Sequence, residues 1–365
     1  MTDSAQDFAG TMPVPDRHLF DTTALQSYLA QHLPDFKGPL SVESFKGGQS
    51  NPTYKLITPA RNYVMRSKPG PVARLQPSAH AIEREYRVIG ALGKAGLPVP
   101  EVYCLCDDES VIGRAFYVMQ CMDGRVLWDQ GLAGFANSER AAIYDEMNRV
   151  MAALHNVDYN AAALGDFGRP GNYFSRQISR WSKQYQVTET EHIEAMNKLI
   201  EFLPGAIPPG DEATVVHGDY RLDNLMFHPT EPRILAVLDW ELSTLGDPLV
   251  DFAYHCMTWH MTNGPTSRGL AGADLAALGI PGEPAYLQTY LQATAQAGRQ
   301  ISADVWGTYL VFNMFRLAGI LQGILGRALQ GNASNAAALE SGRRARPLAE
   351  QAWALAQTLH RGRPH

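Results

Sequence analysis

The stretch that most constrains this chain runs from residue 215 to residue 240 and alternates short apolar runs with polar segments. Residues 215–216 and 225–227 are predicted as short buried strands, with a polar loop between them. The two prolines within 229–232 indicate a turn, and 234–238 reads as a returning strand. A strand–loop–strand–turn–strand unit of this kind brings Asp219, Asn224 and Asp239 to one end of a small sheet.

These three side chains match the needs of phosphoryl transfer. In that reaction the protein itself does little covalent chemistry. It has to place a carboxylate against the attacking hydroxyl and hold metal ions on the phosphates. Asp219 fits the base that orients the hydroxyl. Asn224 and Asp239 supply hard oxygen ligands suited to magnesium. A His-Gly-Asp tripeptide alone is common, and Asp and Asn are ordinary turn residues, so the prediction depends on the whole series.

The series also carries a resemblance to a known family. It comprises His217-Gly218-Asp219, Asn224 five positions after the aspartate, Leu238-Asp239-Trp240-Glu241 and Gly246-Asp247-Pro248. It resembles the aminoglycoside phosphotransferase and choline kinase group of the protein-kinase-like fold, and most of all the kinase-like domains that occur alone or fused to acyl-CoA dehydrogenases. The resemblance implies an α+β, two-lobed fold. We expect a flexible tail over 1–20, an N-terminal lobe of sheet plus helix over 21–118, a linker over 119–124, and a mostly helical C-terminal lobe with the catalytic loop over 125–365.

Composition narrows the class of protein further. The chain has 365 residues and a formal net charge of -6, which argues against nucleic acid as a partner. Four cysteines without a zinc-type spacing suit reduced thiols in the cytoplasm, and the acidic, polar N-terminus matches neither a signal nor a transit peptide. The most apolar segment, 305–329, is predicted as a buried helix and not a membrane span. Four polar side chains interrupt it: Asn313, Arg316, Gln322 and Arg327.

The first two strands, near 39–45 and 54–57, flank a loop that contains Gly47, Gly48 and Ser50. Most glycine pairs between strands are hairpin turns. Ahead of the other features, however, glycines let backbone N–H groups approach a phosphate without side-chain obstruction, and Ser50 could add a hydroxyl. We therefore predict this loop as a cover for the nucleotide phosphates.

A third strand near 62–70 carries the cation of the predicted nucleotide site. By resemblance, Arg66 stands where the family has a lysine that contacts the phosphates, with Lys68 as the second candidate and Val64 as the roof over the adenine ring. Arginine and lysine are not interchangeable at such sites. A helix over 78–92 would then bring Glu85 to Arg66 as an ion pair; the alternative for Glu85 is a solvated charge on an amphipathic helix.

The remaining resemblances concern the linker and the C-terminal lobe. The Gln120 carbonyl and the Met122 amide would bind the adenine edge. Asp251 would brace the catalytic loop from below, and His155 is expected to be a structural residue at a helix end. Asp247 is predicted to cap a helix with Pro248 at its first position. For Glu241, the acceptor pocket and a turn cap both stay open.

The predicted activity is transfer of the γ-phosphoryl group of ATP, with Mg²⁺, to a hydroxyl of a small molecule, without a nucleic acid or membrane partner. The resemblance to dehydrogenase-linked domains suggests a hydroxy acid or a hydroxyacyl thioester. An aminoglycoside- or choline-type acceptor would need acidic clusters or aromatic cages, for which the candidates are Asp166, Glu189, Glu191, Glu194, Trp181, Tyr185 and Trp259. A nucleotide-binding regulatory module with little catalysis is a second class, motivated by Arg66. A protein kinase fits poorly, because His-Gly-Asp and Leu-Asp-Trp replace His-Arg-Asp and Asp-Phe-Gly.

Overall fold

The computed structural model describes residues 10–46, 51–69, 82–210, 212–264, 269–296, 298–329 and 338–360. Contacts divide the chain into two compact units. The sheet unit comprises Met1–Trp128, Ala161–Leu164 and Asp223–Ser243. The helical unit comprises Asp129–Asn160, Gly165–Leu222 and Thr244–His365. The lobe and linker limits expected from the sequence stay a prediction.

The sheet unit is built on a six-stranded antiparallel sheet with the order β1-β2-β3-β4-β6-β5. The three strands expected near 39–45, 54–57 and 62–70 are present in it as β2, β3 and β4. Their bounds are β1 Thr11–Met12, β2 Ser41–Phe45, β3 Thr53–Ile57, β4 Asn62–Ser67, β5 Val102–Cys106 and β6 Phe116–Gln120.

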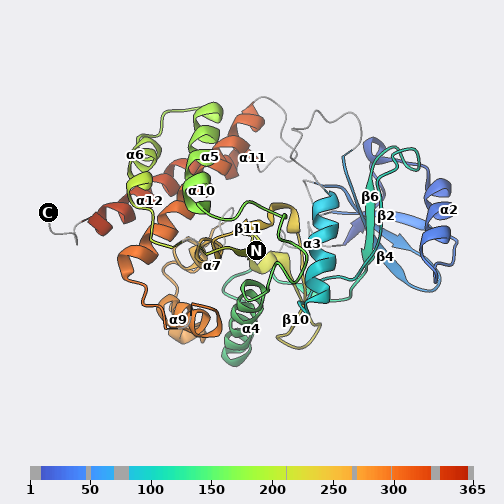
Figure 1. Ribbon diagram of the computed structural model, residues 1–365, viewed down its shortest axis with the longest axis horizontal. Helices are drawn as coiled ribbons and strands as arrows, with labels where there is room; N and C mark the ends of the chain where they lie inside the picture. Colours follow the sequence, from blue (N-terminus) through green and yellow to red (C-terminus); the bar gives the residue numbers. More distant parts are fainter. Residues whose placement is uncertain are drawn as a thin grey trace. The chain divides into compact units, whose positions relative to one another are not determined.

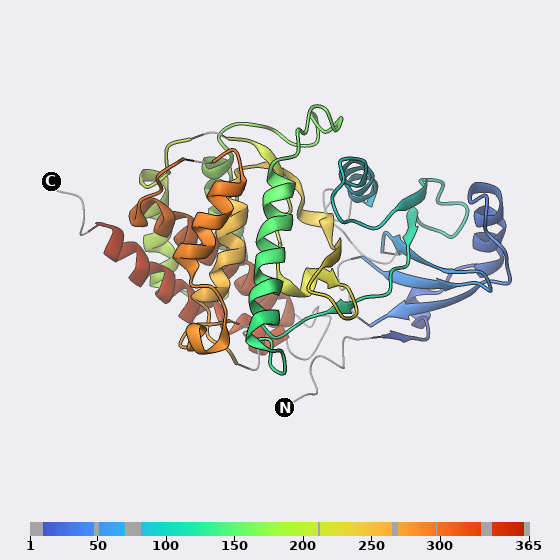
Figure 2. The ribbon, with the colours of Figure 1, turned by 90° about the horizontal axis from the view of Figure 1, so that it is seen from below.

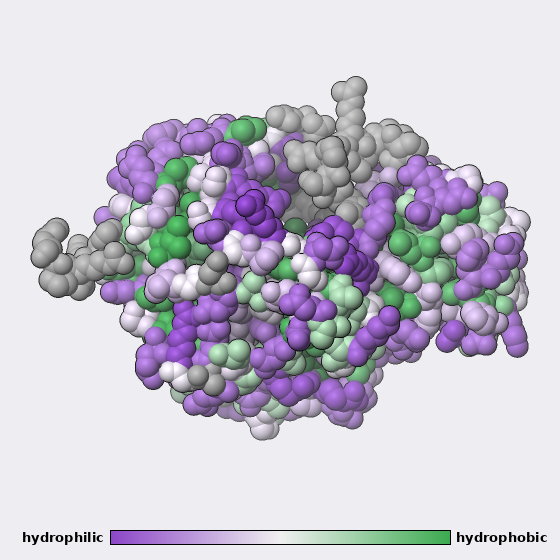
Figure 3. Space-filling model, viewed as in Figure 1, coloured by the Kyte–Doolittle hydropathy of each residue, from purple (hydrophilic) through white to green (hydrophobic). Residues whose placement is uncertain are grey.

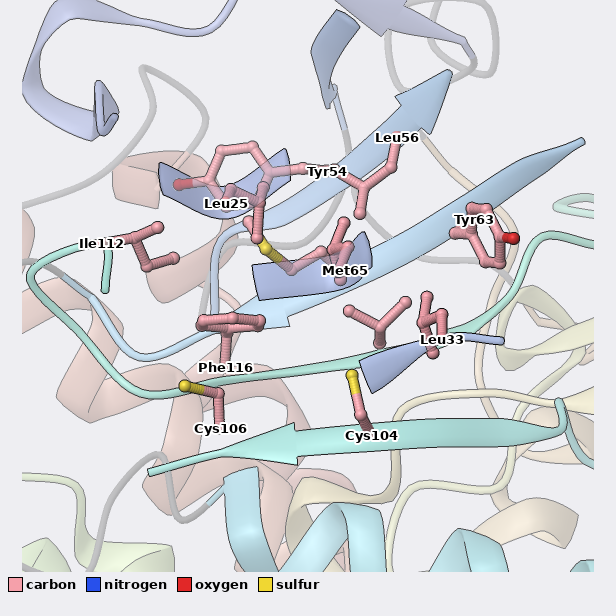
Figure 4. Close-up of a cluster of buried hydrophobic side chains, with 12 residues drawn as sticks. Leu25, Leu33, Tyr54, Leu56, Tyr63, Met65, Cys104, Cys106, Ile112 and Phe116 are labelled. Atoms are coloured by element: carbon pink, nitrogen blue, oxygen red, sulfur yellow. The ribbon is translucent and has the colours of Figure 1, made fainter. Parts of the chain in front are cut away.

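One face of this sheet is covered by α2 (Thr22–His32), whose first turn is capped by the Asp21 carboxylate, as an Asp before an apolar helix predicts. Alternate residues of β3 and β4 point to this face and pack with Leu25 and Leu29 into a buried cluster (Figure 4). Each fully buried leucine there contributes about 2 kcal/mol to stability. The cluster therefore fixes which strand residues remain for the opposite face.

The opposite face carries α3 (Ile82–Lys94), seen beside β6 in Figure 1. Its buried positions recur at helical spacing, and Glu85 is one of them. The first part of the predicted helix, 78–81, lies outside the described residues, as do Gly47, Gly48 and Ser50. Since Tyr63 and Met65 belong to the α2 face, Arg66 of β4 is directed to the α3 side.

A second, three-stranded sheet of the same unit has the order β10-β9-β7, with bounds β7 Arg125–Val126, β9 Leu225–Phe227 and β10 Ile234–Val237. The backbone N–H of Val237 donates to the carbonyl of Pro98 at 2.8 Å. This bond ties the hairpin that contains Asn224 and Asp239 to the segment between α3 and β5.

Residues 10–20 differ from the flexible tail expected of them. Thr11 and Met12 form β1 against β2, and η1 (Asp16–His18) follows. The hydroxyl of Thr11 donates to the Glu43 carboxylate at 2.5 Å. A strand of two residues has no periodicity to detect, so it could not be predicted.

The helical unit holds the longer helices, with bounds α4 Asn137–His155, α5 Tyr173–Thr188, α6 Glu194–Phe202, α7 Pro248–Cys256, α8 Leu275–Leu278, α9 Glu283–Ala293, α10 Ala303–Leu329, α11 Ala338–Gly342 and α12 Ala345–His360. In Figure 2, α9 runs alongside α4. A short antiparallel pair, β8 (Thr214–Val216) with β11 (Thr244–Gly246), supports the polar loop that follows residue 216.

Helix α10 is the centre of this unit and packs against α5, α7, α11 and α12. By length and hydropathy it could cross a membrane, but 78% of its most apolar window is buried inside the protein. The polar residues that interrupt its sequence are used internally: Asn313 donates to the Val250 carbonyl and Gln322 to the Thr190 hydroxyl. These contacts are those of a core helix. The face drawn in Figure 3 accordingly shows hydrophobic residues in separate small areas among hydrophilic ones.

Candidate active site

In the sheet unit, Arg66 is the centre of a cluster of carboxylates. Its Nε lies 3.0 Å from Glu85 Oε2, and its Nη2 lies 2.8 Å from Asp239 Oδ1 and 3.2 Å from Glu241 Oε2. Burial by itself would lower the pKa of Arg66, but the three carboxylates outweigh it and raise the pKa above its usual range. The predicted Arg66–Glu85 pair is confirmed, and Glu241 proves to bind this arginine.

Glu85 is held from three sides. Besides Arg66, it accepts hydrogen bonds from Asn51 Nδ2 at 2.9 Å and from the Tyr117 hydroxyl at 3.1 Å, and all three partners are buried. Burial raises the pKa of the Glu85 carboxyl against the opposing effect of Arg66. Such a network restricts the position of the guanidinium, because Glu85 is itself held by two buried donors besides Arg66. Lys68, the second candidate cation, pairs with Glu83 instead.

Asp239 has an unusual backbone. Its φ of 65° and ψ of 65° lie in the left-handed region, which a non-glycine residue adopts at a cost of about 1–3 kcal/mol. It precedes η4 (Trp240–Leu242) without capping it, and its side chain keeps 35% of its exposure. A strained residue with a partly exposed carboxylate is a candidate ligand for a bound ion.

Asn224 lies at the same end of the β9–β10 hairpin as Asp239. The register pairs Val237 with Leu225, and the Asn224 carbonyl accepts a hydrogen bond from the Leu238 N–H at 2.8 Å. The two proposed metal ligands therefore lie at one end of a single hairpin, as the strand–turn–strand pattern predicted. They belong to the sheet unit together with Arg66.

The residues predicted around the adenine ring also lie in the sheet unit. Val64 is buried on β4 and pairs with Met119 of β6. Gln120 ends β6 and is exposed, and its N–H donates to the Glu101 carbonyl at 2.7 Å. Met122 is half-buried in the segment between β6 and β7. The roles of these residues stay a prediction.

In the helical unit, the loop after β8 is braced by Asp251 of α7. Its Oδ2 accepts from the His217 N–H at 2.7 Å, and its Oδ1 accepts from the Gly218 N–H at 2.8 Å. Burial alone would raise the pKa of Asp251, but His155 and the loop N–H groups lower it, so the carboxylate stays charged. The predicted brace is confirmed. His155, 3.2 Å from Asp251 and 2.6 Å from the Tyr290 hydroxyl, is the structural residue expected.

The loop places Asp219 directly after a turn that needs glycine, because Gly218 has a φ of 85°. Oδ1 of Asp219 accepts from the Tyr254 hydroxyl at 2.5 Å, and Arg221 Nε lies 3.1 Å from the same oxygen. Burial, and next the charge of Asp219, raise the pKa of Tyr254, so that its hydroxyl keeps its proton and donates. Asp219 is thus held in one orientation by two donors.

A second clamp on this loop comes from α10. Arg316 is buried and donates through Nη2 to the Gly218 carbonyl at 2.8 Å. Its guanidinium carbon lies 5.1 Å from the centre of the Tyr254 ring and 5.7 Å from that of Trp181. Asp247 caps α7 through the Leu249 and Val250 N–H groups, as predicted.

Most of the residues weighed for a cationic acceptor already have partners within the protein. Glu191 and Glu194 are exposed and pair with Arg346 and Lys198, and Tyr185 is fully buried. The Trp181 ring already has the Arg180 and Arg316 guanidinium carbons 5.7 Å from its centre. Trp259 packs among aromatic rings. Glu189 and Glu194 lie 3.9 Å and 3.2 Å from His192, and Glu189 also accepts from the Tyr185 hydroxyl at 3.4 Å, so these side chains already bind groups of the protein itself.

Sequence reasoning missed several functional contacts. Asn51, Tyr117 and Tyr254 were given no role, and Arg316 was noted only as an interruption of an apolar helix. A sequence signal existed for two of them. Tyr254 follows Asp251 by three positions on α7, so both face the same loop. Arg316 is a charge within an apolar run, which implies a buried partner.

These features match those expected of a phosphotransferase with the protein-kinase-like fold. The chain belongs to the phosphotransferase enzyme family, whose profile matches residues 41–303. It is 44% identical over 348 residues to mouse acyl-CoA dehydrogenase family member 10. That match covers 95% of this chain but 32% of the mouse protein, so the chain spans about a third of that relative.

Solved structures agree on family and fold. A protein from Ralstonia eutropha JMP134, provisionally named an aminoglycoside phosphotransferase, is 59% identical, with a TM-score of 0.84 over 93% of this chain and 99% of that one. Choline kinase from Cryptosporidium parvum Iowa II (13% identity, TM-score 0.64, 93% and 98% covered) shares the fold. Aminoglycoside phosphotransferase APH(4)-Ia in complex with AMP-PNP and hygromycin B also shares the fold. Its sequence identity is 17%, with a TM-score of 0.59 over 91% of this chain and 98% of that one. The predicted two-lobed kinase-like fold is confirmed.

Proposed function

We propose that this protein is an ATP- and magnesium-dependent kinase that phosphorylates a hydroxyl group of a small molecule. The observation that carries the proposal is Arg66, one buried cation that binds both Glu85 of α3 and Asp239 of the β9–β10 hairpin. Such an arrangement sets a cation and an ion ligand side by side, as binding of nucleotide phosphates requires. The AMP-PNP held by APH(4)-Ia, which shares the fold, supports ATP as the donor.

On the nucleotide side, Arg66 would bind the phosphates through its planar fork. The loop with Gly47, Gly48 and Ser50 would cover them with backbone N–H groups. Val64 would pack on the adenine ring, and the Gln120 carbonyl and Met122 amide would bind its edge. These assignments extend the resemblance to positions that lie within one unit of the chain.

The donor set suits magnesium. Three carboxylates surround one arginine, so the cluster carries an excess of two negative charges if Glu85, Asp239 and Glu241 are ionised. A divalent cation near Asp239 would offset that excess, and carboxylate and amide oxygens are the ligands it prefers. Asp239 and Asn224 would hold the ion. Once bound, magnesium would neutralise charge on the transferring phosphoryl group.

On the acceptor side, Asp219 would accept the hydroxyl's hydrogen bond and orient the oxygen for in-line attack. Asp251 and Arg316 keep the loop backbone fixed, so that little rearrangement is needed during the reaction. We expect Asp219→Ala to lower kcat by about 100-fold or more, which is the usual scale for a positioned general base.

The acceptor is proposed to be a hydroxy acid or a hydroxyacyl thioester. Arg221 and Arg316 contact the Asp219 loop, and a cationic amine brought to that loop would be repelled by both. This argues against aminoglycosides and choline. The similarity to acyl-CoA dehydrogenase family member 10 supports an acyl substrate. The four cysteines are all free thiols, in keeping with a protein of the cytoplasm, where ATP is available.

The test is ADP release from ATP and magnesium over a panel of hydroxy acids, hydroxyacyl thioesters, aminoglycosides and choline. Wild-type protein is compared with Asp219→Ala and with Asp158→Ala, which removes an exposed carboxylate. Acceptor-dependent turnover that disappears only in Asp219→Ala supports the proposal. Tight ATP binding in calorimetry without turnover on any acceptor would favour a regulatory module instead, and near-normal turnover by Asp219→Ala would eliminate Asp219 as the base.

A further inference from the structure

Among the buried polar atoms of the helical unit that have no hydrogen-bond partner within the described part of the chain are two neighbouring donors, Nε of Arg316 and Nε1 of Trp181. Arg316 is 8% exposed, and its guanidinium carbon lies 5.7 Å from the Trp181 ring centre. Buried donors are nearly always satisfied in native proteins, and an exception calls for an explanation. Here two exceptions are neighbours, one on α5 and one on α10.

The charge of Arg316 is equally unusual. Within the described residues no carboxylate lies at ion-pair distance from it; its contacts are the Gly218 carbonyl and the faces of two aromatic rings. A buried guanidinium without a counter-ion is unfavourable, because carbonyls and ring faces only partly replace its hydration. An anionic group bound there would supply the missing charge and the missing acceptor together.

The position links this pair of donors to the proposed reaction. Arg316 contacts the residue immediately before Asp219, and the Tyr254 ring under Arg316 carries the hydroxyl that donates to Asp219. One tyrosine therefore touches both the arginine and the candidate base. A ligand group at Arg316 would lie beside the place where the acceptor hydroxyl has to be.

We propose that Arg316 and Trp181 form the subsite that binds an anionic oxygen group of the acceptor. The proposal rests on the proposed function, since it takes Asp219 as the base. The ligand chemistry is a carboxylate or phosphate oxygen that accepts from Arg316 Nε and Trp181 Nε1. Charge-assisted bonds from a planar guanidinium are among the strongest available for such groups. The source of the anion is either the carboxylate of a free hydroxy acid or the phosphates of a coenzyme A thioester.

Binding can be measured without turnover. In ¹⁵N-labelled protein, the indole N–H of Trp181 and the Nε–H of Arg316 are assigned through Trp181→Phe and Arg316→Lys. The probes are lactate, 3-hydroxybutyrate and their coenzyme A thioesters, with 1,3-butanediol as the uncharged match and sodium chloride as the ionic-strength control. We expect saturable shifts of both signals with at least one hydroxy acid or thioester and none with the diol. Shifts with the free acids would identify a carboxylate as the bound anion, and shifts with the thioesters alone would identify the phosphates of coenzyme A.

Three variants then test the residues. Trp181→Phe keeps the ring under Arg316 but removes the donor, and Arg316→Lys keeps the charge but removes the fork. Each is expected to raise the Kd of the bound anion about tenfold, the scale of one charge-assisted hydrogen bond. Arg180→Gln is the matched control, because it removes an exposed cation at the same ring. The Kd of the anion for Arg180→Gln should stay within about twofold of the wild-type value, as expected for a solvated charge.

The outcomes separate this inference from the kinase proposal. Equal binding of diol and acid, shifts that sodium chloride reproduces, or an unchanged Kd in both Trp181→Phe and Arg316→Lys would overturn the subsite and indicate an ordered water only. Those results would leave the role of Asp219 standing, because they involve no phosphoryl transfer. Conversely, Asp219→Ala with full activity would remove the kinase assignment of the base while the anion could still bind. If Arg316→Lys fails to fold, the Kd of the anion in Trp181→Phe is sufficient to test the subsite.

Discussion

Nη2 of Arg66 lies 2.8 Å from Oδ1 of Asp239, while Nε of the same side chain lies 3.0 Å from Oε2 of Glu85. These partners stand 173 and 19 positions away in the sequence. One guanidinium therefore connects a helix and a hairpin through two of its nitrogens. A lysine has a single nitrogen, so it cannot reproduce this bridge with the same geometry.

The first prediction follows from that bridge. Arg66→Lys, although it installs the family's residue, is expected to release either Glu85 or Asp239 and to raise the KM for ATP about tenfold, equivalent to about 1.4 kcal/mol. The measurement is steady-state kinetics at varied ATP. Arg114→Lys is the control, because Arg114 is a buried arginine of the same unit that binds the Leu19 carbonyl and none of these carboxylates. An unchanged KM in Arg66→Lys would contradict the bridging role.

Asp251→Asn tests the brace under the candidate base. The carboxylate accepts two backbone N–H groups, one on each oxygen. An amide leaves one of them facing an NH₂ group, so we expect a loss of about 1–3 kcal/mol of unfolding free energy. Because Asp219 would then be misplaced, kcat should fall about tenfold or more while the KM for ATP changes little. Urea unfolding and kinetics check the two effects, and a normal kcat in a destabilised variant would refute the positioning role.

Gly218→Ala tests the turn before Asp219. With φ at 85°, an added Cβ strains the backbone by about 1–3 kcal/mol. Gly134→Ala is a matched control, since Gly134 has a φ of 87° and an added Cβ there meets nothing within 4 Å. Both variants should lose similar thermal stability, and only Gly218→Ala should lose kcat. Equal kcat in the two variants would show that the turn does not set the position of Asp219.

Asp247 supplies a prediction on pH. Burial raises the pKa of Asp247 to about 6 from 3.8, against the opposing hydrogen bonds from the Leu249 and Val250 N–H groups. Between these values the folded protein holds the proton that the unfolded chain releases, so this group's contribution to stability is complete below about 3.8 and is lost as the pH rises through about 6. The full loss is of the order of 3 kcal/mol.

Asp247→Asn keeps a capping oxygen but has no proton to release. We expect it to be more stable than wild type at pH 8, by about 1–3 kcal/mol, with the difference shrinking toward pH 4. Urea unfolding across this range is the measurement. A wild type and variant that keep a constant difference from pH 4 to pH 8 would disprove the raised pKa.

Much of the fold could be predicted because its signals are local. Asp21 before an apolar helix, the alternation of β3 and the continuous apolar runs of β4 and β6 each lie within one element. The hairpin that carries Asn224 and Asp239 was predictable for the same reason, since two short apolar runs and a proline turn sit within a few residues of each other.

The contacts that complete the site could not be predicted, because they join distant parts of the chain. Asn51 reaches Glu85 across 34 positions, and Arg316 reaches Gly218 across 98. Composition and periodicity do not indicate which buried side chains will meet at such separations. The left-handed backbone conformation of Asp239 could not be predicted either, because a single strained residue leaves no pattern in the sequence.

The hairpin's membership of the sheet unit has a practical consequence. Residues Asp223–Ser243 belong with Met1–Trp128, although about a hundred residues of mostly helical chain intervene. Cutting the gene after the sixth strand would therefore yield a fragment without Asp239, with Arg66 and Glu85 left short of a partner. Anyone who wishes to express the sheet unit separately, or to exchange it between relatives, has to splice the later segment back in.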